Sequence, residues 1–149
     1  MTTEGDLEPR LSARLTYLLK RALVALEDLH AEHLAPIGVN GRELAVLLLL
    51  DGHNPESQQQ VAGRLRVDRT TMVALLDGLE AKGLVARHAD AGDRRRNVVE
   101  LTGDGRTALV RAVRASDEAE RQLLAEFDDD ESAQLRTLLT RLIQDRSKP

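Results

Sequence analysis

The sequence predicts a mainly α-helical chain in which a helix-turn-helix is followed by a small β-hairpin. Leucine and alanine, both strong helix formers, supply 27 and 18 of its 149 residues. Apolar residues recur at steps of three and four near both ends of the chain, which is the spacing of amphipathic helices. Between residues 84 and 101 this spacing gives way to short strand-like runs around a turn-rich loop.

The first long helix is expected over residues 9–34. It starts with a proline, which suits the first position of a helix, and Pro36 with Gly38 ends it. Leu19 and Leu23 widen its apolar stripe. The stripe is therefore broader than one neighbouring helix would cover.

A second helix is expected to begin at a capping box formed by Asn40 and Glu43. In such a box, the two side chains satisfy backbone N–H groups that the first helical turn leaves without partners. Residues 44–50, which follow the box, are apolar on every side of the helix. This pattern predicts that the second helix is buried.

Two shorter helices follow, over residues 57–65 and 69–82. A capping box of Ser57 with Gln60 opens the first, and Asp68 caps the second. The expected core positions of the second helix are Met72, Leu75, Leu76 and Leu79. Because so few residues separate the two helices, their spacing indicates a helix-turn-helix.

Residues 84–88 and 97–101 are predicted strands, and the loop between them holds three consecutive arginines near its tip. A helix-turn-helix followed by an arginine-tipped hairpin is a winged helix-turn-helix, expected here over residues 40–102. An α-helix fits the major groove of B-DNA, while a hairpin tip can enter the minor groove. Arginine suits that tip because a narrow minor groove concentrates negative potential.

Two more helices are expected, one over residues 102–127 and one opened by a capping box of Asp128 with Glu131. The apolar face of the last helix consists of Leu135, Leu138, Leu139, Leu142 and Ile143. Segments 7–35 and 103–147 together carry more apolar surface than a winged domain of this size can cover. We therefore expect them to form a dimerisation region, with folding back into a monomeric bundle as the alternative.

The net charge of −4 argues against nonspecific coating of nucleic acid, but the charge is unevenly distributed. Residues 1–56 carry a net charge of −4, residues 57–106 carry +2, and residues 107–149 carry −2. Of the 21 basic residues, 18 are arginines. The middle third, which contains the predicted helix-turn-helix and hairpin, is the net-positive part of the chain.

Several functional classes are excluded. The chain has no cysteine, which excludes disulfides, thiolate zinc sites and thiol nucleophiles, and its two aromatic residues are too few for single-strand base stacking. It has no P-loop, nucleophile elbow or dinucleotide fingerprint, so we expect no enzyme and no cofactor. Glu27, His30 and His33 have a spacing that a metal could use, but a di-iron bundle needs a second copy of this motif. Surface or interface histidines, without a metal, are therefore expected.

No apolar run approaches the roughly 20 residues of a membrane-spanning helix. Residues 1–9 have neither the basic start nor the apolar stretch of a signal peptide. We therefore expect a cytoplasmic protein that does not bind a membrane.

Residues 57–105 resemble the MarR family of bacterial winged-helix regulators. The resemblance is carried by the stretch from Gln60 to Arg87, by Asp90-Ala-Gly-Asp-Arg-Arg-Arg-Asn-Val-Val-Glu-Leu-Thr102 and by Gly105. The family's wing signature is an Asp-Pro-x-Asp-Arg-Arg run followed by a valine-rich strand and Leu-Thr. Here Ala91 replaces the proline. The outer helices match the family in length and order.

The resemblance implies a homodimer, built by the first helix and the last two, that presents two winged domains to a pseudo-palindromic operator. Two-fold symmetry predicts half-sites about one helical turn, roughly 10 bp, apart. The implied function is sequence-specific transcriptional regulation, which we expect to be repression relieved by a small molecule.

Within the wing, Arg95 matches the arginine that enters the minor groove, and Asp93 matches the acidic partner that orients it. Arg94 and Arg96 flank Arg95 and are expected to meet phosphates. The alternative is that all three are solvated loop arginines.

In the recognition helix, Arg69, Thr70 and Val73 are expected to face DNA. A bidentate contact from Arg69 to guanine would be worth about 1–3 kcal/mol of discrimination. Many relatives have a basic residue where Ala74 stands, so we expect thymine-methyl contacts or shape readout to carry more of the specificity. The expected phosphate-positioning residues, for which simple solvation is the alternative, are Gln58, Gln59 and Arg66.

Relatives commonly bind phenolic or other small amphipathic acids between the dimer-forming helices and the winged domain. In this chain, that crevice is expected near His30, His33, Leu44 and Leu48. Two alternatives are a regulator without an effector and a winged domain that binds an acidic protein partner instead of DNA.

Overall fold

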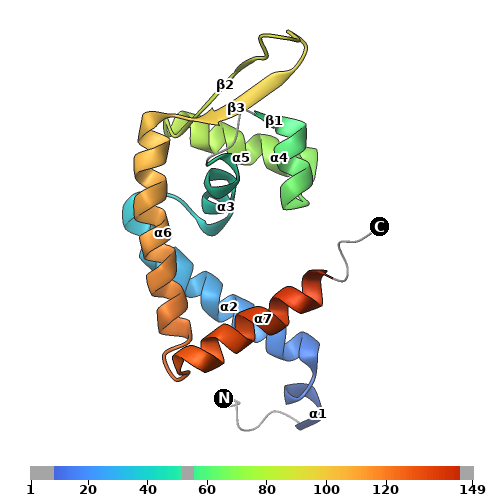
Figure 1. Cartoon of the computed structure of the whole chain (residues 1–149), viewed down its shortest axis with the longest axis vertical. Helices are drawn as coiled ribbons and strands as arrows, with labels where there is room; N and C mark the ends of the chain where they lie inside the picture. The colour runs from blue at the N-terminus through green and yellow to red at the C-terminus, as the bar shows by residue number, and fades with distance from the viewer. Residues whose placement is uncertain (1–8, 52–55, 145–149) are drawn as a thin grey trace, which may run out of the picture.

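The structure is a computed structural model that describes residues 9–51 and 56–144. The elements, in chain order, are α1 (Pro9–Ser12), α2 (Leu15–Leu34), the 3-10 helix η2 (Ala35–Ile37), α3 (Gly41–Leu50), β1 (Glu56–Ser57), α4 (Gln58–Leu65), α5 (Arg69–Ala81), β2 (Val85–Ala89), β3 (Asn97–Leu101), α6 (Gly103–Leu123) and α7 (Asp129–Gln144). In Figure 1, α3, α4, α5 and the hairpin form one lobe, and the long helices α2, α6 and α7 extend away from it.

The first helix is broken, which corrects the single helix predicted over residues 9–34. α1 ends at Ser12, whose hydroxyl donates a 3.2 Å hydrogen bond to the Pro9 carbonyl oxygen. Such a bond competes with continuation of the helix. Arg14 then has an extended backbone (φ −75°, ψ 136°) before α2 begins. α2 is followed by η2, which ends, as predicted, at Gly38 in the left-handed conformation (φ 82°).

α3 begins at the predicted capping box. The Asn40 side chain accepts a 2.8 Å hydrogen bond from the Glu43 N–H, and the Glu43 carboxylate accepts a 3.0 Å bond from the Asn40 N–H. The buried apolar residues of α3 are Leu44, Val46, Leu47 and Leu50. The prediction that this helix is buried on every side was wrong for Leu48, which is 49% exposed. α2, α4, α5, α6 and β3 pack against α3 but leave the side that carries Leu48 uncovered.

The helix-turn-helix consists of α4 and α5, as predicted. The turn between them contains Arg66, a non-glycine residue in the left-handed region (φ 54°). In α5, Met72, Leu76 and Leu79 are buried and Leu75 is half-buried, which confirms the expected core face. The capping box predicted at Ser57 depends on a side chain that lies outside the described part of the chain.

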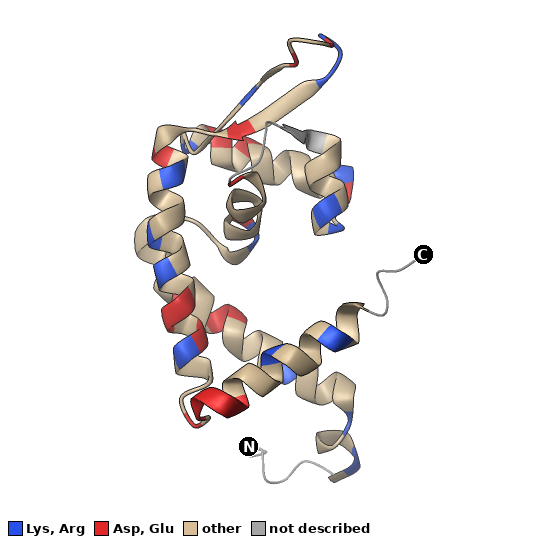
Figure 2. Ribbon diagram, viewed as in Figure 1, with Lys and Arg blue, Asp and Glu red and all other residues tan. Residues whose placement is uncertain are grey.

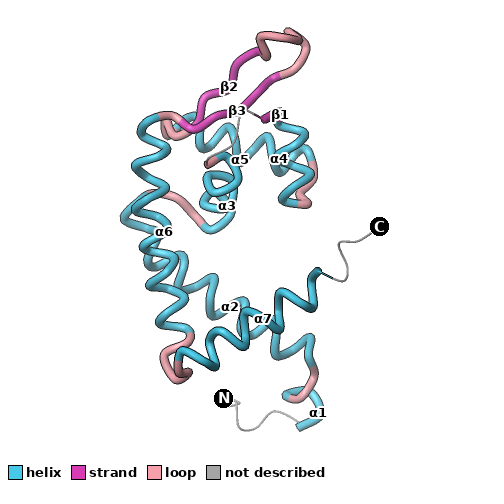
Figure 3. The backbone as a smooth tube through the Cα atoms, in the orientation of Figure 1, coloured by secondary structure: helices cyan, strands magenta, loops and turns pink. Residues whose placement is uncertain are grey.

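The hairpin belongs to a three-stranded antiparallel sheet with the order β1-β3-β2. The short strand β1 was not predicted. β3 has the predicted bounds, and β2 begins one residue later than predicted because Leu84 still belongs to the turn after α5, where its N–H donates to the Leu79 carbonyl oxygen (3.0 Å). Val85 pairs with Leu101 at the base of the hairpin, and the strands extend beyond the helices of their lobe (Figure 3).

α6 is capped by Thr102, whose hydroxyl oxygen accepts a 3.0 Å hydrogen bond from the Gly105 N–H. The helix ends at Leu123, whereas the sequence predicted an end near Phe127. The correction has a local reason: the Phe127 N–H donates to the carbonyl oxygen of Leu124, three residues earlier (2.9 Å), so the chain leaves the α-helix in a tight turn.

α7 starts at the predicted capping box, in which Asp128 and Glu131 exchange hydrogen bonds of 2.8 and 3.1 Å. No residue of α7 is buried, and its apolar residues Leu138, Leu142 and Ile143 are 57%, 58% and 65% exposed. α2 likewise has an exposed apolar stripe, consisting of Leu15, Leu18, Leu19, Leu23 and Val24. The core lies elsewhere, where α3, α4, α5, α6 and the sheet meet.

Within residues 9–51 and 56–144, no single helix is long and apolar enough to cross a membrane. By length and composition, Leu15–Ile37 and Gly41–Leu50 would reach that threshold together, across a 69° bend. The same residues contain no group of three or more His, Asp or Glu side chains arranged to hold a metal ion.

Candidate nucleic-acid interface

α5 buries one face and exposes the other. Arg69, Thr70 and Val73, which were predicted to face DNA, are all exposed. The first turn is fixed by Asp68, whose carboxylate accepts a 2.6 Å hydrogen bond from the Thr71 N–H. This hydrogen bond lowers the pKa of Asp68 below its usual value. The exposed start of α5 is therefore a capped and well-defined helical surface.

Two hollows, with volumes of about 450 and 630 Å³, border α5 on opposite sides. The larger one, about 630 Å³, lies between α5 and the hairpin, and we call it the wing groove. Its lining residues are Gln59, Ala62, Arg69, Met72, Val73, Asp93, Arg95, Arg96 and Asn97. The fold thus gathers predicted site residues from α4, α5 and the hairpin around one concave surface. Arginines contribute to its walls, and Met72 is buried beneath it.

The tip of the hairpin is held by its own backbone and by Asp93. The Asp93 carboxylate accepts a 3.0 Å hydrogen bond from the Arg95 N–H, and its carbonyl oxygen accepts one from the Arg96 N–H (3.0 Å). The Asp90 N–H donates to the Arg96 carbonyl oxygen (2.8 Å). Asp93 therefore meets Arg95 at the main chain, where it fixes the shape of the turn that carries the guanidinium.

The three wing arginines have different environments. Arg96 donates a 2.6 Å hydrogen bond to the side-chain oxygen of Gln60, which ties the hairpin to α4. The Arg94 and Arg95 guanidinium groups are exposed and form no hydrogen bond or ion pair within the described part of the chain. Their charges are thus available to an external anion.

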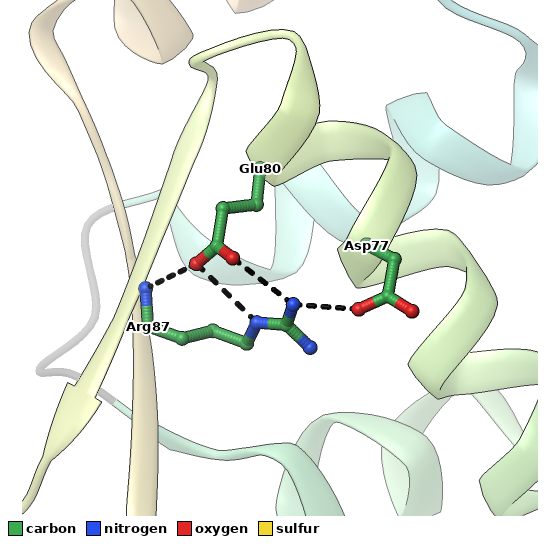
Figure 4. A network of polar contacts seen from close by, with 3 residues as sticks. All are labelled: Asp77, Glu80 and Arg87. Atoms are coloured by element: carbon green, nitrogen blue, oxygen red, sulfur yellow. Dashed lines mark hydrogen bonds and ion pairs between the residues drawn. The ribbon is translucent and has the colours of Figure 1, made fainter.

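Arg87 on β2 connects the hairpin to α5, a contact that sequence reasoning missed. Its guanidinium contacts Asp77 (2.6 Å) and Glu80 (3.0 Å), which lie on one face of α5, and its N–H also donates to Glu80 (3.2 Å; Figure 4). The hydrogen bonds that Glu80 accepts from Arg87 lower the pKa of Glu80, and those that Arg87 donates to Glu80, and then to Asp77, raise the pKa of Arg87. No local spacing signals this contact, because its partners lie in different elements.

A second ion pair joins α3 to the end of α5. The Lys82 ammonium lies 2.9 Å from each carboxylate oxygen of Glu43, which is buried (5% exposed) and also forms the α3 capping box. Glu43 thus has partners for its charge and for both oxygens. This ion pair fixes the last turn of the recognition helix to α3, and the cap at Asp68 stabilises its first turn.

Thr70, Arg66 and Arg94, which were predicted to bind DNA, are not among the residues that line the wing groove. Thr70 and Arg66 line separate hollows on the side of α5 nearer α3. Gln58 is the first residue of α4, but its side chain lies outside the described part of the chain.

The predicted effector-binding residues occupy different environments. His30 Nε2 lies 2.8 Å from the Ser116 hydroxyl, and His33 Nε2 lies 2.6 Å from the Gln122 side-chain oxygen, so both histidines join α2 to α6. Leu44 is buried in the core and Leu48 is exposed. Their role in binding a ligand remains a prediction.

Charge is distributed along the molecule as the sequence suggested. Figure 2 shows basic residues at the hairpin tip and around the winged lobe, and a cluster of acidic residues at the corner between α6 and α7. The first turn of α7 alone contains Asp129, Asp130 and Glu131. The end of the molecule that carries the wing groove is therefore the one suited to an anionic partner.

A helix-turn-helix, a sheet-based wing and a groove lined with arginine between them define a winged helix-turn-helix protein. Over 144 residues the chain is 30% identical to the HTH-type transcriptional regulator PecS of Dickeya dadantii (strain 3937), with 92% of this chain and 82% of PecS covered. Residues 37–96 match the MarR family. The chain belongs to the MarR family of transcriptional regulators.

Solved structures show the same architecture. The transcriptional repressor CouR bound to a 23-mer DNA duplex is 32% identical, with a TM-score of 0.86 over 92% of this chain and 98% of that chain. CouR from Rhodococcus jostii RHA1 bound to p-coumaroyl-CoA is 29% identical, with a TM-score of 0.77 over 91% of this chain and 95% of that chain.

Proposed function

We propose that this chain is a dimeric repressor that binds a pseudo-palindromic operator and is released by a small phenolic or amphipathic acid or its thioester. The observation that carries the proposal is the wing groove. It brings the exposed face of the recognition helix onto one surface with Arg95, which forms no hydrogen bond or ion pair with any described residue.

The geometry of the groove suits B-DNA. The start of α5 is exposed, and an α-helix fits the major groove. The hairpin, whose loop contains Arg94 and Arg95, extends beyond the lobe (Figure 3), where it could reach a minor groove. In this proposal Arg69 reads a base edge, Arg95 enters the minor groove and Arg94 contacts a phosphate. CouR, which shares this fold, is a repressor seen on a DNA duplex.

The exposed apolar stripes on α2 and α7 support the dimer. Single exposed leucines are common on protein surfaces, but a contiguous apolar face marks an interaction site. A second copy would cover both stripes and place two recognition helices on one side of the duplex. With two-fold symmetry, they would meet half-sites about 10 bp apart.

CouR bound to p-coumaroyl-CoA supports a phenolic acyl thioester as the class of effector. We place the ligand near His30, His33, Leu44 and Leu48, between the long helices and the winged lobe. It would release DNA by favouring a state in which the two recognition helices no longer match the operator. The protein would act by binding alone, without catalysis, and in the cytoplasm, where its DNA lies.

Gel-shift titration on the DNA upstream of the protein's own gene tests the proposal. Arg69→Ala is expected to lose preference for that DNA over a scrambled duplex, by about 1–3 kcal/mol for a lost bidentate base contact. Arg94→Ala is expected to weaken binding to both duplexes and to flatten the salt dependence, because a phosphate contact is independent of sequence.

If the wild-type protein shows no preference for any upstream sequence over scrambled DNA, the proposed function is wrong. A wing that binds an acidic protein would give this result. The same titration with p-coumaroyl-CoA and simple phenolic acids tests the effector.

A further inference from the structure

The side of α5 opposite the wing groove has a second basic surface, whose central residue is Arg42 on α3. Arg42 lines two adjoining hollows, of about 450 and 410 Å³. One is shared with Arg66 and Asp68 in the turn before α5, and the other with Thr70 and Ala74 on α5 itself. The exposed face of α5 is therefore bordered by arginine on both sides.

No described residue neutralises the charge of Arg42. Arg42 is exposed and forms no hydrogen bond or ion pair with any other described residue. The two carboxylates that line these hollows already have other partners. Glu43 accepts hydrogen bonds from the Asn40 N–H and from Lys82, and Asp68 accepts one from the Thr71 N–H.

A recognition helix in the major groove lies between two phosphate strands. The wing arginines can meet the strand on one side, and residues on the α3 side of α5 face the other. Ala74 leaves room for a phosphate beside Arg42, since a long side chain at this position would fill the hollow that both residues line. Arg66, expected from the sequence to meet a phosphate, lines the adjoining hollow.

We propose that Arg42 binds the DNA phosphate strand on the side of the recognition helix opposite the wing, with Arg66 beside it. The inference rests on the proposed function and adds a contact from α3, outside the helix-turn-helix and the wing. Arg42 would position the helix in the groove and would not read bases. Phosphate contacts set register and orientation without sequence information.

Arg42→Gln in the full-length chain tests the contact, with Arg111→Gln on α6 as a matched control, since Arg111 is also exposed and forms no described polar contact. Loss of one phosphate contact in each half of a dimer is expected to reduce the slope of log K against log salt by about 1.8. The decrease in this slope should be equal on operator and scrambled DNA. Arg42→Lys should restore most of the slope, and thermal unfolding midpoints of all variants should match the wild type.

Methylphosphonate substitution then locates the contact. For the wild type, neutralising one phosphate per half-site on the side away from the wing should weaken binding, and for Arg42→Gln the same substitution should have no further effect. The inference is wrong if wild-type protein binds the operator and Arg42→Gln has the slope of wild type and of Arg111→Gln. If wild-type protein binds no duplex at all, the proposed function itself fails.

Discussion

At the scale of single residues, Arg87 determines how the wing is held relative to the recognition helix. Two acidic residues on α5 hold its guanidinium, and its side chain is 21% exposed. The contact also neutralises Asp77 on the helix that we place in the major groove. Phosphate and base contacts tolerate little displacement, so the contact of Arg87 with α5 matters to binding although Arg87 need not touch DNA.

Arg87→Met, which keeps most of the aliphatic stem, is expected to weaken operator binding by roughly tenfold, or about 1.4 kcal/mol. The released wing should lose hydroxyl-radical protection of the minor groove, while protection of guanines in the major groove persists. Arg121→Met, which breaks the exposed pair of Arg121 with Glu118 on α6, is the matched control and should change neither pattern. Equal loss of both protections by Arg87→Met would contradict a role in wing orientation.

Asp68 gives the start of α5 a defined pH dependence. Its pKa is lower in the folded chain than in the unfolded chain because the Thr71 N–H stabilises the carboxylate. The resulting stability is fully present above the unfolded pKa, about 3.9, and is lost as the pH falls through the lower folded pKa. The difference in unfolding midpoint between wild type and Asp68→Ala should therefore be constant near neutral pH and shrink below about pH 4. A difference that grows on acidification would refute this.

At the scale of elements, the packing of the first turn of α6 against the backbone of Leu84 depends on Gly105. A Cβ atom at this position would lie 2.0 Å from the Leu84 carbonyl oxygen, which also accepts a hydrogen bond from the Thr102 N–H (3.1 Å). Gly105→Ala is therefore expected to destabilise the fold by about 1–3 kcal/mol, measured by denaturant unfolding. Gly103→Ala, whose Cβ would meet no atom within 4 Å, should cost little. Equal stability of the two variants would show that the close approach is unimportant.

Local signals explain which elements could be predicted from the sequence. The capping boxes at Asn40 and Asp128 and the cap at Asp68 depend on residues three positions apart, so their helix starts were correct. The break between α1 and α2 and the two-residue strand β1 were missed. The break depends on the hydrogen bond from the Ser12 hydroxyl to the Pro9 carbonyl oxygen, and β1 depends on pairing with β3, which is distant in sequence.

The site shows the same distinction. The exposure of the wing arginines and of Arg69 could be predicted because helix and hairpin patterns place them on the surface. The roles of Arg87 and Arg42 could not be predicted. The acidic partners of Arg87 lie on another element, and the hollows that Arg42 lines are formed by elements that meet only in the folded lobe. The sequence also gave no signal that Arg66 would adopt a left-handed backbone.

At the scale of the whole molecule, a basic winged lobe is joined to long helices that carry acidic residues and exposed apolar stripes. The acidic end would discourage nonspecific contact with DNA and leave binding to the fitted arginines. A second copy would cover the apolar stripes. Operator recognition would then require dimerisation, because each copy supplies one recognition helix. Two copies of this chain are therefore expected to bind one symmetric operator.

Hydroxyl-radical footprinting on the DNA upstream of its own gene tests this claim most directly. We expect two protected half-sites about 10 bp apart, centred on a pseudo-palindrome, with both halves appearing at the same protein concentration. A single protected half-site, or protection that is no stronger than on scrambled DNA, would contradict it.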